Sequence, residues 1–193
     1  LQNTRNPLDA AVDRITANGL RVMAGFIIGF DGEKSGAGPR IVEFVTRTGI
    51  PAAMMGMLQA LPKTALWARL EREGRLIQNE DAAKGVNQTN LLNFKPTRPI
   101  REIANEYVES FCALYEPNAY MDRVYSYYLK MGAPRWKAAP KLPTWTDIRA
   151  LSIVVWRQGI KRDTRWRFWR YMIGMARQNP ALLEQFLVVL AHN

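Results

Sequence analysis

"VMAGFIIGFDGE", residues 22–33, is the stretch from which the fold of this chain can be inferred. It opens with a nearly continuous apolar run, as in a strand that is buried on both faces of a parallel sheet. A turn containing Gly29, Gly32 and Glu33 follows, and a helical pattern begins near Pro39. Ligands bind at the carboxyl ends of the strands in sheets of this kind, so the turn is a candidate binding site.

The order of a helix followed by a strand occurs twice in the first 76 residues. Helical spacing of apolar residues covers 7–18 and 39–49, and apolar runs that indicate strands cover 20–30 and 50–61. A third helix is expected over 64–76, with Thr64 as its N-cap and Gly74 at its end. This alternation predicts an α/β fold in which crossover helices join parallel strands.

The remainder of the chain is predicted to be mainly helical. Residues 77–99 read as an irregular connection with one short extended piece, "NLLNF", and residues 100–132 as two helices that are broken near Pro117. A Pro-rich linker is expected over 133–144. The last segment, 145–193, is a basic tail with three short helices, at 145–158, 164–178 and 180–192.

The chain has one cysteine, Cys112, and one histidine, His192. These counts exclude an internal disulfide, and they leave no ligand set within this chain for a cysteine-bound cluster, a His-based metal site or a catalytic triad. A chain without disulfides fits a reducing compartment, so we expect a cytoplasmic protein. Cys112 shares an apolar helical stripe with Val108, Phe111 and Tyr115, which predicts a place in the core.

The ends of the chain and its apolar runs bear on its cellular context. No apolar run reaches the roughly 18–20 residues that a membrane-spanning helix needs, and the first residues are too polar for a signal peptide. The sequence begins with Leu1 and not with Met. We therefore expect a fragment or a processed product of a longer protein.

The turn after residue 28 has two interpretations on its own chemistry. Gly29 and Gly32 would let main-chain amides approach a ligand closely, Phe30 could contact a flat heterocycle, and Asp31 and Glu33 could accept hydrogen bonds from it. The simpler interpretation is a tight strand-to-helix turn in which the acids cap the helix. A glycine pattern without its context does not decide between them.

Four ordered blocks of the sequence supply that context. They are 25–31 ("GFIIGFD"), 58–66 ("LQALPKTAL"), 89–96 ("TNLLNFKP") and 114–124 ("LYEPNAYMDRV"). Together they resemble the C-terminal part of radical S-adenosylmethionine proteins that carry an N-terminal cobalamin-binding domain and a helical, DUF4070-like C-terminal extension. The resemblance implies that residues 1–76 are the last β/α units of a partial TIM-type barrel, and that an α-helical extension follows.

The same resemblance implies residues that bind the cofactor. Gly25, Ile27 and Gly29 would line the wall against which the adenine of S-adenosylmethionine packs, with Phe30 and Glu33 near it. Gln59, at the end of the next strand, would contact the cofactor or the substrate. Glu33 lies one residue later than in the family pattern. Lys63 stands where a glycine is usual, so we expect an altered turn there.

The activity implied by the resemblance is radical methyl transfer, or related carbon-centred radical chemistry, on a small-molecule or lipid-like substrate. S-adenosylmethionine, a [4Fe–4S] cluster and cobalamin would be the cofactors of the full-length protein. The cluster-binding C-x-x-x-C-x-x-C motif and the cobalamin-binding domain would lie upstream of Leu1. We therefore expect this fragment to be inactive without its missing N-terminal domains, and we assign no catalytic residue.

The basic tail leaves several partners open. Between residues 135 and 177 there are eleven Lys or Arg and two acids. The predicted helix from Thr164 places Trp166, Trp169, Ile173 and Ala176 on one face, which could pack onto the barrel or the missing domains. Interleaved Trp and Arg also suit peripheral membrane association, and nucleic acid is the least favoured partner. The alternative to an enzyme is a non-catalytic α/β plus helical interaction domain with a membrane- or polyanion-docking tail.

Overall fold

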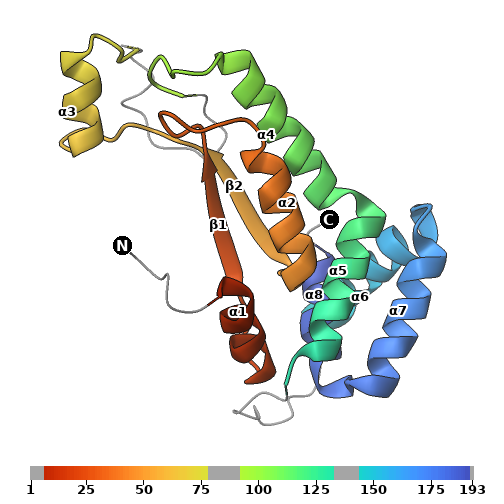
Figure 1. Ribbon diagram of the computed structural model, residues 1–193. Helices are drawn as coiled ribbons and strands as arrows, with labels where there is room; N and C mark the ends of the chain where they lie inside the picture. The colour runs from red at the N-terminus through yellow and green to blue at the C-terminus, as the bar shows by residue number, and fades with distance from the viewer. Residues whose placement is uncertain (1–6, 78–91, 133–143, 192–193) are drawn as a thin grey trace. The chain divides into compact units, whose positions relative to one another are not determined.

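The structure, a computed structural model, describes residues 7–77, 92–132 and 144–191 (Figure 1). The first elements are α1 (Leu8–Ala17), β1 (Met23–Ile28), α2 (Ala37–Thr48), β2 (Ala52–Met57) and α3 (Ala65–Arg72). They are followed by α4 (Ile100–Tyr115), α5 (Pro117–Lys130), α6 (Trp145–Trp156), the π-helical turn η2 (Arg157–Lys161), α7 (Arg165–Gln178), the 3₁₀ turn η3 (Pro180–Leu182) and α8 (Leu183–Leu190). The α/β class and the helical C-terminal region are therefore confirmed.

The sheet of the described residues has two strands, β1 and β2, which lie side by side and parallel (Figure 1). The Leu58 amide donates to the Ile28 carbonyl at 2.9 Å, which continues the pairing to the carboxyl end of the sheet. Two strands do not make a barrel, so the partial TIM-type barrel stays a prediction. An antiparallel bridge between Leu76 and Phe94 accounts for the short extended piece expected near residue 92. The predicted linker at 133–144 lies outside the described residues except for Thr144.

Helix boundaries follow from local capping chemistry. Thr64 caps α3, because its hydroxyl accepts from the Trp67 amide at 3.3 Å, and Gly74 follows the helix with φ +64°. The break between α4 and α5 is set by Glu116, whose carboxylate accepts from the Ala119 amide at 2.6 Å, and by Pro117 in the first turn. A proline there lacks only an amide that the helix would leave unpaired.

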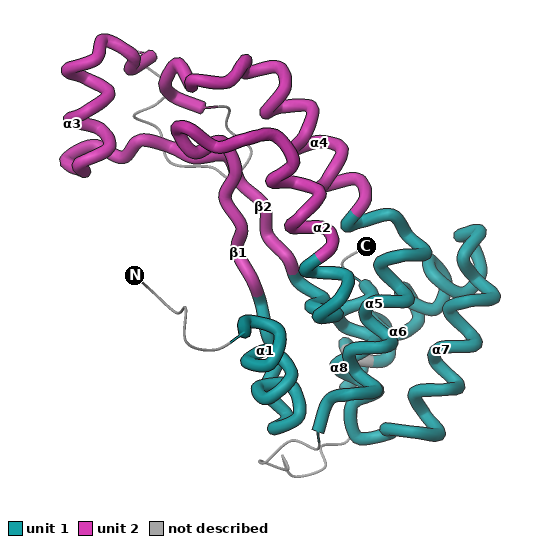
Figure 2. Tube along the Cα trace, viewed as in Figure 1, with its two compact units in different colours: residues 1–23, 44–52, 114–193 teal, residues 24–43, 53–113 magenta. Residues whose placement is uncertain are grey.

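The chain divides into two compact units that are interleaved in sequence (Figure 2). Unit 1 comprises residues 1–23, 44–52 and 114–193, and unit 2 comprises 24–43 and 53–113. The domain boundaries expected from the sequence stay a prediction.

Unit 1 is a helical core built around α5. Its fully buried side chains include Tyr127 and Tyr128 of α5, Phe168 of α7 and Phe186 of α8. In Figure 1, α7 runs beside α5, and the two helices are in contact. The Tyr120 hydroxyl donates to the Val189 carbonyl at 3.0 Å and so connects α5 to α8. Burial of these aromatic side chains stabilises the unit.

The first helix belongs to this unit as well. The Tyr127 hydroxyl accepts from the Val22 amide at 2.7 Å, and the Gly132 amide donates to the Thr16 carbonyl at 3.1 Å. A side chain at position 132 would collide with the carbonyl of Ala17, so the close approach requires glycine. Asp9 of α1 also pairs with Arg47 of α2 at 2.9 Å.

Unit 2 contains most of both strands, α3 and most of α4. One face of the sheet is covered, since Ile28, Ala53 and Met55 are almost fully buried. On α4, the Tyr107 hydroxyl donates to the Met55 carbonyl at 3.4 Å. Glu106 of the same helix accepts from the Gly38 amide at 2.7 Å and pairs with Arg98 at 2.8 Å. These contacts fix the start of α2 and the strand β2 to α4.

The expectation about Cys112 was wrong, and the partner of the predicted face of α7 stays a prediction. Cys112 is exposed, because α4 buries Ile103, Ser110 and Leu114 instead of the predicted stripe. In α7 the fully buried residues are Phe168 and Met175; of the predicted face, Trp169 is partly buried against the core, whereas Trp166 and Ile173 are exposed. In both helices several apolar side chains compete for the core, and the position of the neighbouring helices decides which of them are buried.

Candidate functional site: an open sheet face and the strand ends

The second face of the sheet is open. Along β1, exposed and more buried residues alternate, and Ile27 on the open side is 51% exposed. Met54 of β2 lies on the same side and is 41% exposed. A hollow of about 350 Å³ lies along this face, lined by Gly25, Phe26, Ile27 and residues 54–59 and 61. Apart from Gln59 its lining is apolar, so it can accommodate a large non-polar group.

Gly25 keeps part of this face clear. No atom lies within 4 Å of the place that a Cβ at Gly25 would occupy. The residue is exposed, and its neighbour on the open side, Ile27, adds a flat aliphatic surface. A ligand can therefore approach the backbone of β1 closely at this point.

Gly29, at the end of β1, has a different environment. It is buried with φ +89°, and a Cβ there would lie 3.1 Å from Leu92 and 3.4 Å from Ile103. Its amide donates to the Glu33 carboxylate at 2.8 Å. Gly29 and Glu33 thus stabilise the turn through a hydrogen bond within it. Glu33 does not cap α2, because that helix begins four residues later, at Ala37.

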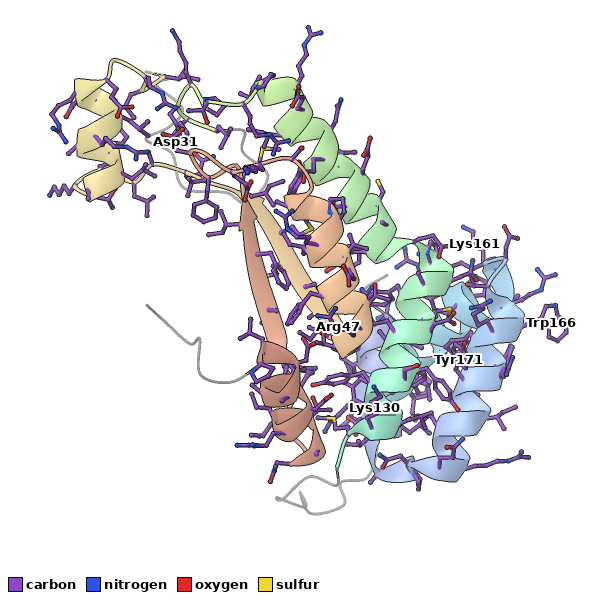
Figure 3. All side chains as sticks on the ribbon, in the orientation of Figure 1. Asp31, Arg47, Lys130, Lys161, Trp166 and Tyr171 are labelled. Atoms are coloured by element: carbon purple, nitrogen blue, oxygen red, sulfur yellow. The ribbon has the colours of Figure 1, made fainter. Side chains whose placement is uncertain are left out.

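The loop that follows β1 is fixed by an ion-pair network around Asp31, which is labelled in Figure 3. The Asp31 carboxylate accepts from Arg75 at 2.6 Å and from Arg69 at 2.7 Å. The hydrogen bond from Arg75 holds the pKa of Asp31 below its ordinary value, although burial acts in the opposite direction. Arg75 also donates to the Lys95 carbonyl at 2.8 Å. The network joins the loop to α3, to its exit and to the segment around residue 95.

Residues 92–97 connect the ends of both strands. The side-chain amide of Asn93 accepts from the Ala60 amide and donates to the Ala60 carbonyl, both at 2.9 Å. Thr97 accepts from the Gly32 amide at 3.1 Å, and Leu92 covers Gly29. Asn93 thus holds the backbone between Gln59 and Leu61, two residues that line the hollow.

The turn after β2 keeps the conformation that a glycine would adopt. Lys63 has φ +67°, in the left-handed region that non-glycine residues rarely occupy. The expectation that a lysine here alters the turn was therefore wrong. The Thr64 amide donates to the Leu61 carbonyl at 3.2 Å, and Thr64 still caps α3. Lys63 is therefore a position of local backbone strain, next to a residue that hydrogen bonds hold in place.

The structure brings together three of the six residues expected to bind the cofactor. Gly25, Ile27 and Gln59 line the hollow. Gly29 and Glu33 lie in the turn and are bonded to each other, and Phe30 is exposed at the loop but outside the lining. Their roles toward a ligand stay predictions. Sequence reasoning missed Asn93 as a positioning residue, and Met54, Gly56 and Leu61 as lining residues. The period-two alternation of residues 54, 56 and 58 is the signal that could have identified the open side of β2.

Comparison with known proteins identifies a family that matches this chain. Residues 64–193, more than half of the chain, match the family model described as "Domain of unknown function (DUF4070)". The chain belongs to the DUF4070 family. The family expected from the four sequence blocks is thereby confirmed. Among the described residues, no helix is both long and apolar enough to cross a membrane.

Two relatives of this DUF4070 chain are named for methyl transfer. An "uncharacterized methyltransferase" of Synechocystis sp. is 59% identical over 193 residues, which are all of this chain and 35% of the relative. A "hopanoid C-2 methylase" of Rhodopseudomonas palustris is 26% identical over 196 residues, covering 99% of this chain and 36% of the relative. The DUF4070 chain thus spans little more than a third of the length of these relatives. No solved structure matches it.

Proposed function

We propose that this DUF4070 chain is the C-terminal part of a cobalamin-dependent radical S-adenosylmethionine enzyme that methylates a lipid-like substrate. The names of both relatives support methyl transfer by the longer protein. The radical and cobalamin chemistry comes from the resemblance of the four sequence blocks. The observation that carries the proposal is the open, apolar face of β1 and β2 beside the carboxyl ends of the strands.

The described residues fit the adenosyl part of S-adenosylmethionine on this face. Gly25 leaves room for a flat ring against the backbone, and Ile27 offers an apolar contact for it. Gln59 supplies a donor and an acceptor at the edge of the hollow. Glu33 is less suitable as a ligand, because its carboxylate already accepts from the Gly29 amide.

Within this proposal the chain positions the reacting groups and shields them from water. When bound, S-adenosylmethionine with its cluster would supply the hydrogen-abstracting radical, and cobalamin the methyl group. Ile27, Met54 and Leu61 would exclude water from the hollow. Gln59 would orient a polar group, and Asn93 would keep Gln59 in place through its two bonds to Ala60. The partial barrel would be completed by upstream strands.

The character of the lining supports the substrate class. The part of the hollow that the adenosyl group leaves free is lined by apolar residues such as Met54, Leu58 and Leu61, which would suit a hydrocarbon skeleton in the substrate. The relative named as a hopanoid C-2 methylase points in the same direction. Within the proposal the activity would belong in the cytoplasm, because a reduced cluster needs a reducing compartment.

The full-length protein, reconstituted with iron, sulfide and cobalamin without oxygen, tests the proposal. We expect Gly25→Val to weaken S-adenosylmethionine binding in equilibrium dialysis by about tenfold or more, because the branched side chain fills the clear space on β1. Transfer of labelled methyl groups to a lipid extract should fall in parallel. Met23→Val, two residues earlier on the same side of β1 and outside the hollow, is the matched control and should change neither value.

The outcomes separate the proposal from its alternative. A full-length protein that binds neither iron nor S-adenosylmethionine would support the non-catalytic interaction domain instead. If Gly25→Val and Met23→Val reduce binding equally, the open face is not the cofactor wall.

A further inference from the structure

The outward face of α6 is apolar although it lies outside the core. Trp145 is 80% exposed and Trp156 is 61% exposed. Eleven residues correspond to three helical turns and about 20°, so the two indoles project from the same side of the helix, about 16 Å apart along its axis. Ile148 and Ile153 lie between the two indoles along the axis, one at each edge of that side, and both are about half exposed. Val154 and Val155 of α6 pack onto the core of unit 1, whereas Leu151, which lies between them around the helix axis, is 46% exposed.

The apolar surface continues into η2, which directly follows α6 in the chain. Ile160 of this turn is half exposed. We call these five side chains the α6 surface: Trp145, Ile148, Ile153, Trp156 and Ile160. Large apolar side chains gathered in this way on an exposed helix mark a site of association.

Cations accompany the α6 surface. Arg149 lies on the same side of the helix, and Arg157 and Lys161 follow in η2. All three are exposed, and no carboxylate among the described side chains forms an ion pair with them. Over residues 145–178 the chain has eight Lys or Arg and two Asp. At the start of α7, Trp166 points away from the helix, and the Arg165 guanidinium lies 6.0 Å from its ring centre (Figure 3).

We propose that the α6 surface docks onto a bilayer that contains anionic lipids. The inference rests on exposure and charge, and not on the proposed function. Tryptophan and aliphatic side chains would enter the boundary between headgroups and acyl chains, while Arg149, Arg157 and Lys161 would contact lipid phosphates. The helix would lie in the plane of the membrane.

The composition of the α6 surface favours an anionic bilayer over single-stranded nucleic acid, the other polyanion that it could bind. Single-stranded nucleic acid would use the aromatic rings for stacking and the cations for phosphates. It would leave Ile148, Ile153 and Ile160 without a role, whereas a bilayer buries all three. Burial against an apolar protein surface would leave the cations near that surface unpaired, which is costly.

Vesicle co-sedimentation of the full-length protein tests the inference. We expect binding to phosphatidylcholine vesicles that contain 30% phosphatidylglycerol, and at least about tenfold weaker binding to pure phosphatidylcholine. Trp145→Ser/Trp156→Ser should lower binding to the anionic vesicles by about tenfold or more, since both indoles leave the boundary region. Arg149→Gln/Arg157→Gln/Lys161→Gln should reduce the preference for anionic lipid and its sensitivity to salt.

Leu8→Ser/Leu20→Ser is the matched control, because both leucines are exposed in the same unit and lie outside the α6 surface. It should leave vesicle binding unchanged, and circular dichroism would verify that all variants are folded. Equal binding to neutral and anionic vesicles would overturn the inference. So would unchanged binding of the double tryptophan variant, or tighter binding to a single-stranded oligonucleotide than to anionic vesicles.

Discussion

The loop after β1 and the helix α6 use their charged and aromatic side chains in opposite ways. Around Asp31, both arginines are paired within unit 2, and the buried ring of Phe94 supports the connecting segment. On α6 the tryptophans are exposed, and Arg149 has no ion-pair partner among the described side chains. The first region is stabilised by contacts within the chain, so it can present a preformed surface to a ligand. The exposed side chains of α6 can instead bind a molecule outside the chain.

Substitution of one aromatic residue from each region should give the largest difference. We expect Phe94→Ala to lower the free energy of unfolding by about 3–5 kcal/mol, because the ring is fully buried. Trp156→Ala should change it by less than about 0.5 kcal/mol, since that side chain is mostly exposed. Urea denaturation of both variants measures the two values. Similar losses in the free energy of unfolding of both variants would show that Trp156 and α6 are part of a core.

Substitution of one arginine from each region should give an intermediate difference. Arg75→Met should cost about 1–3 kcal/mol, because it leaves the largely buried Asp31 carboxylate with fewer hydrogen bonds. Arg149→Met, in which an exposed cation is lost, should cost less than about 0.5 kcal/mol. Urea denaturation again provides the measurement, and equal effects would contradict the distinction.

The same pair predicts a pH dependence. The pKa of Asp31 in the folded protein lies below its ordinary value of 3.8, chiefly because Arg75 hydrogen-bonds to the charged form. The stabilisation from Asp31 is therefore complete above about pH 5, and it is lost as the pH falls through the folded-state pKa. Asp31→Asn should make the free energy of unfolding less dependent on pH below 4. An unchanged acid dependence would show that Asp31 does not contribute to it.

The smallest expected effect concerns Lys63, in the turn that borders the hollow. Lys63→Gly should raise the free energy of unfolding by about 0.5–1 kcal/mol, because glycine adopts φ +67° without strain. Lys63→Ala keeps the Cβ and should give no such gain. Thermal unfolding of both variants provides the measurement. If the two substitutions have the same effect, the backbone at Lys63 is not strained.

The order of helices and strands could be predicted from the sequence because it depends on local signals. Apolar spacing located α1 and α2, Thr64 located the start of α3, and Pro117 located the break before α5. Each signal acts within a few residues and needs no knowledge of distant contacts.

Features that depend on distant residues could not be predicted in this way. The role of Asn93 depends on Ala60, which is thirty-three positions earlier, and the pairing of Asp31 with Arg75 spans forty-four. The exposure of Cys112 depends on which side of α4 is covered by other elements. In the candidate site, the resemblance of the block at 25–31 indicated Gly25 and Ile27, whereas the burial of Gly29 by Leu92 required the fold.

Because unit 1 combines residues 1–23 with residues 114–193, segments of related proteins cannot be exchanged freely in chimeras. Val22 and Thr16 are hydrogen-bonded to α5 and to Gly132, more than a hundred residues later in the chain. A chimera joined at the α4–α5 boundary would combine α1 from one parent with α5 from another, and the fit at Gly132 and Tyr127 would be lost. Grafting the C-terminal helices onto a related enzyme therefore requires residues 8–22 from the same donor.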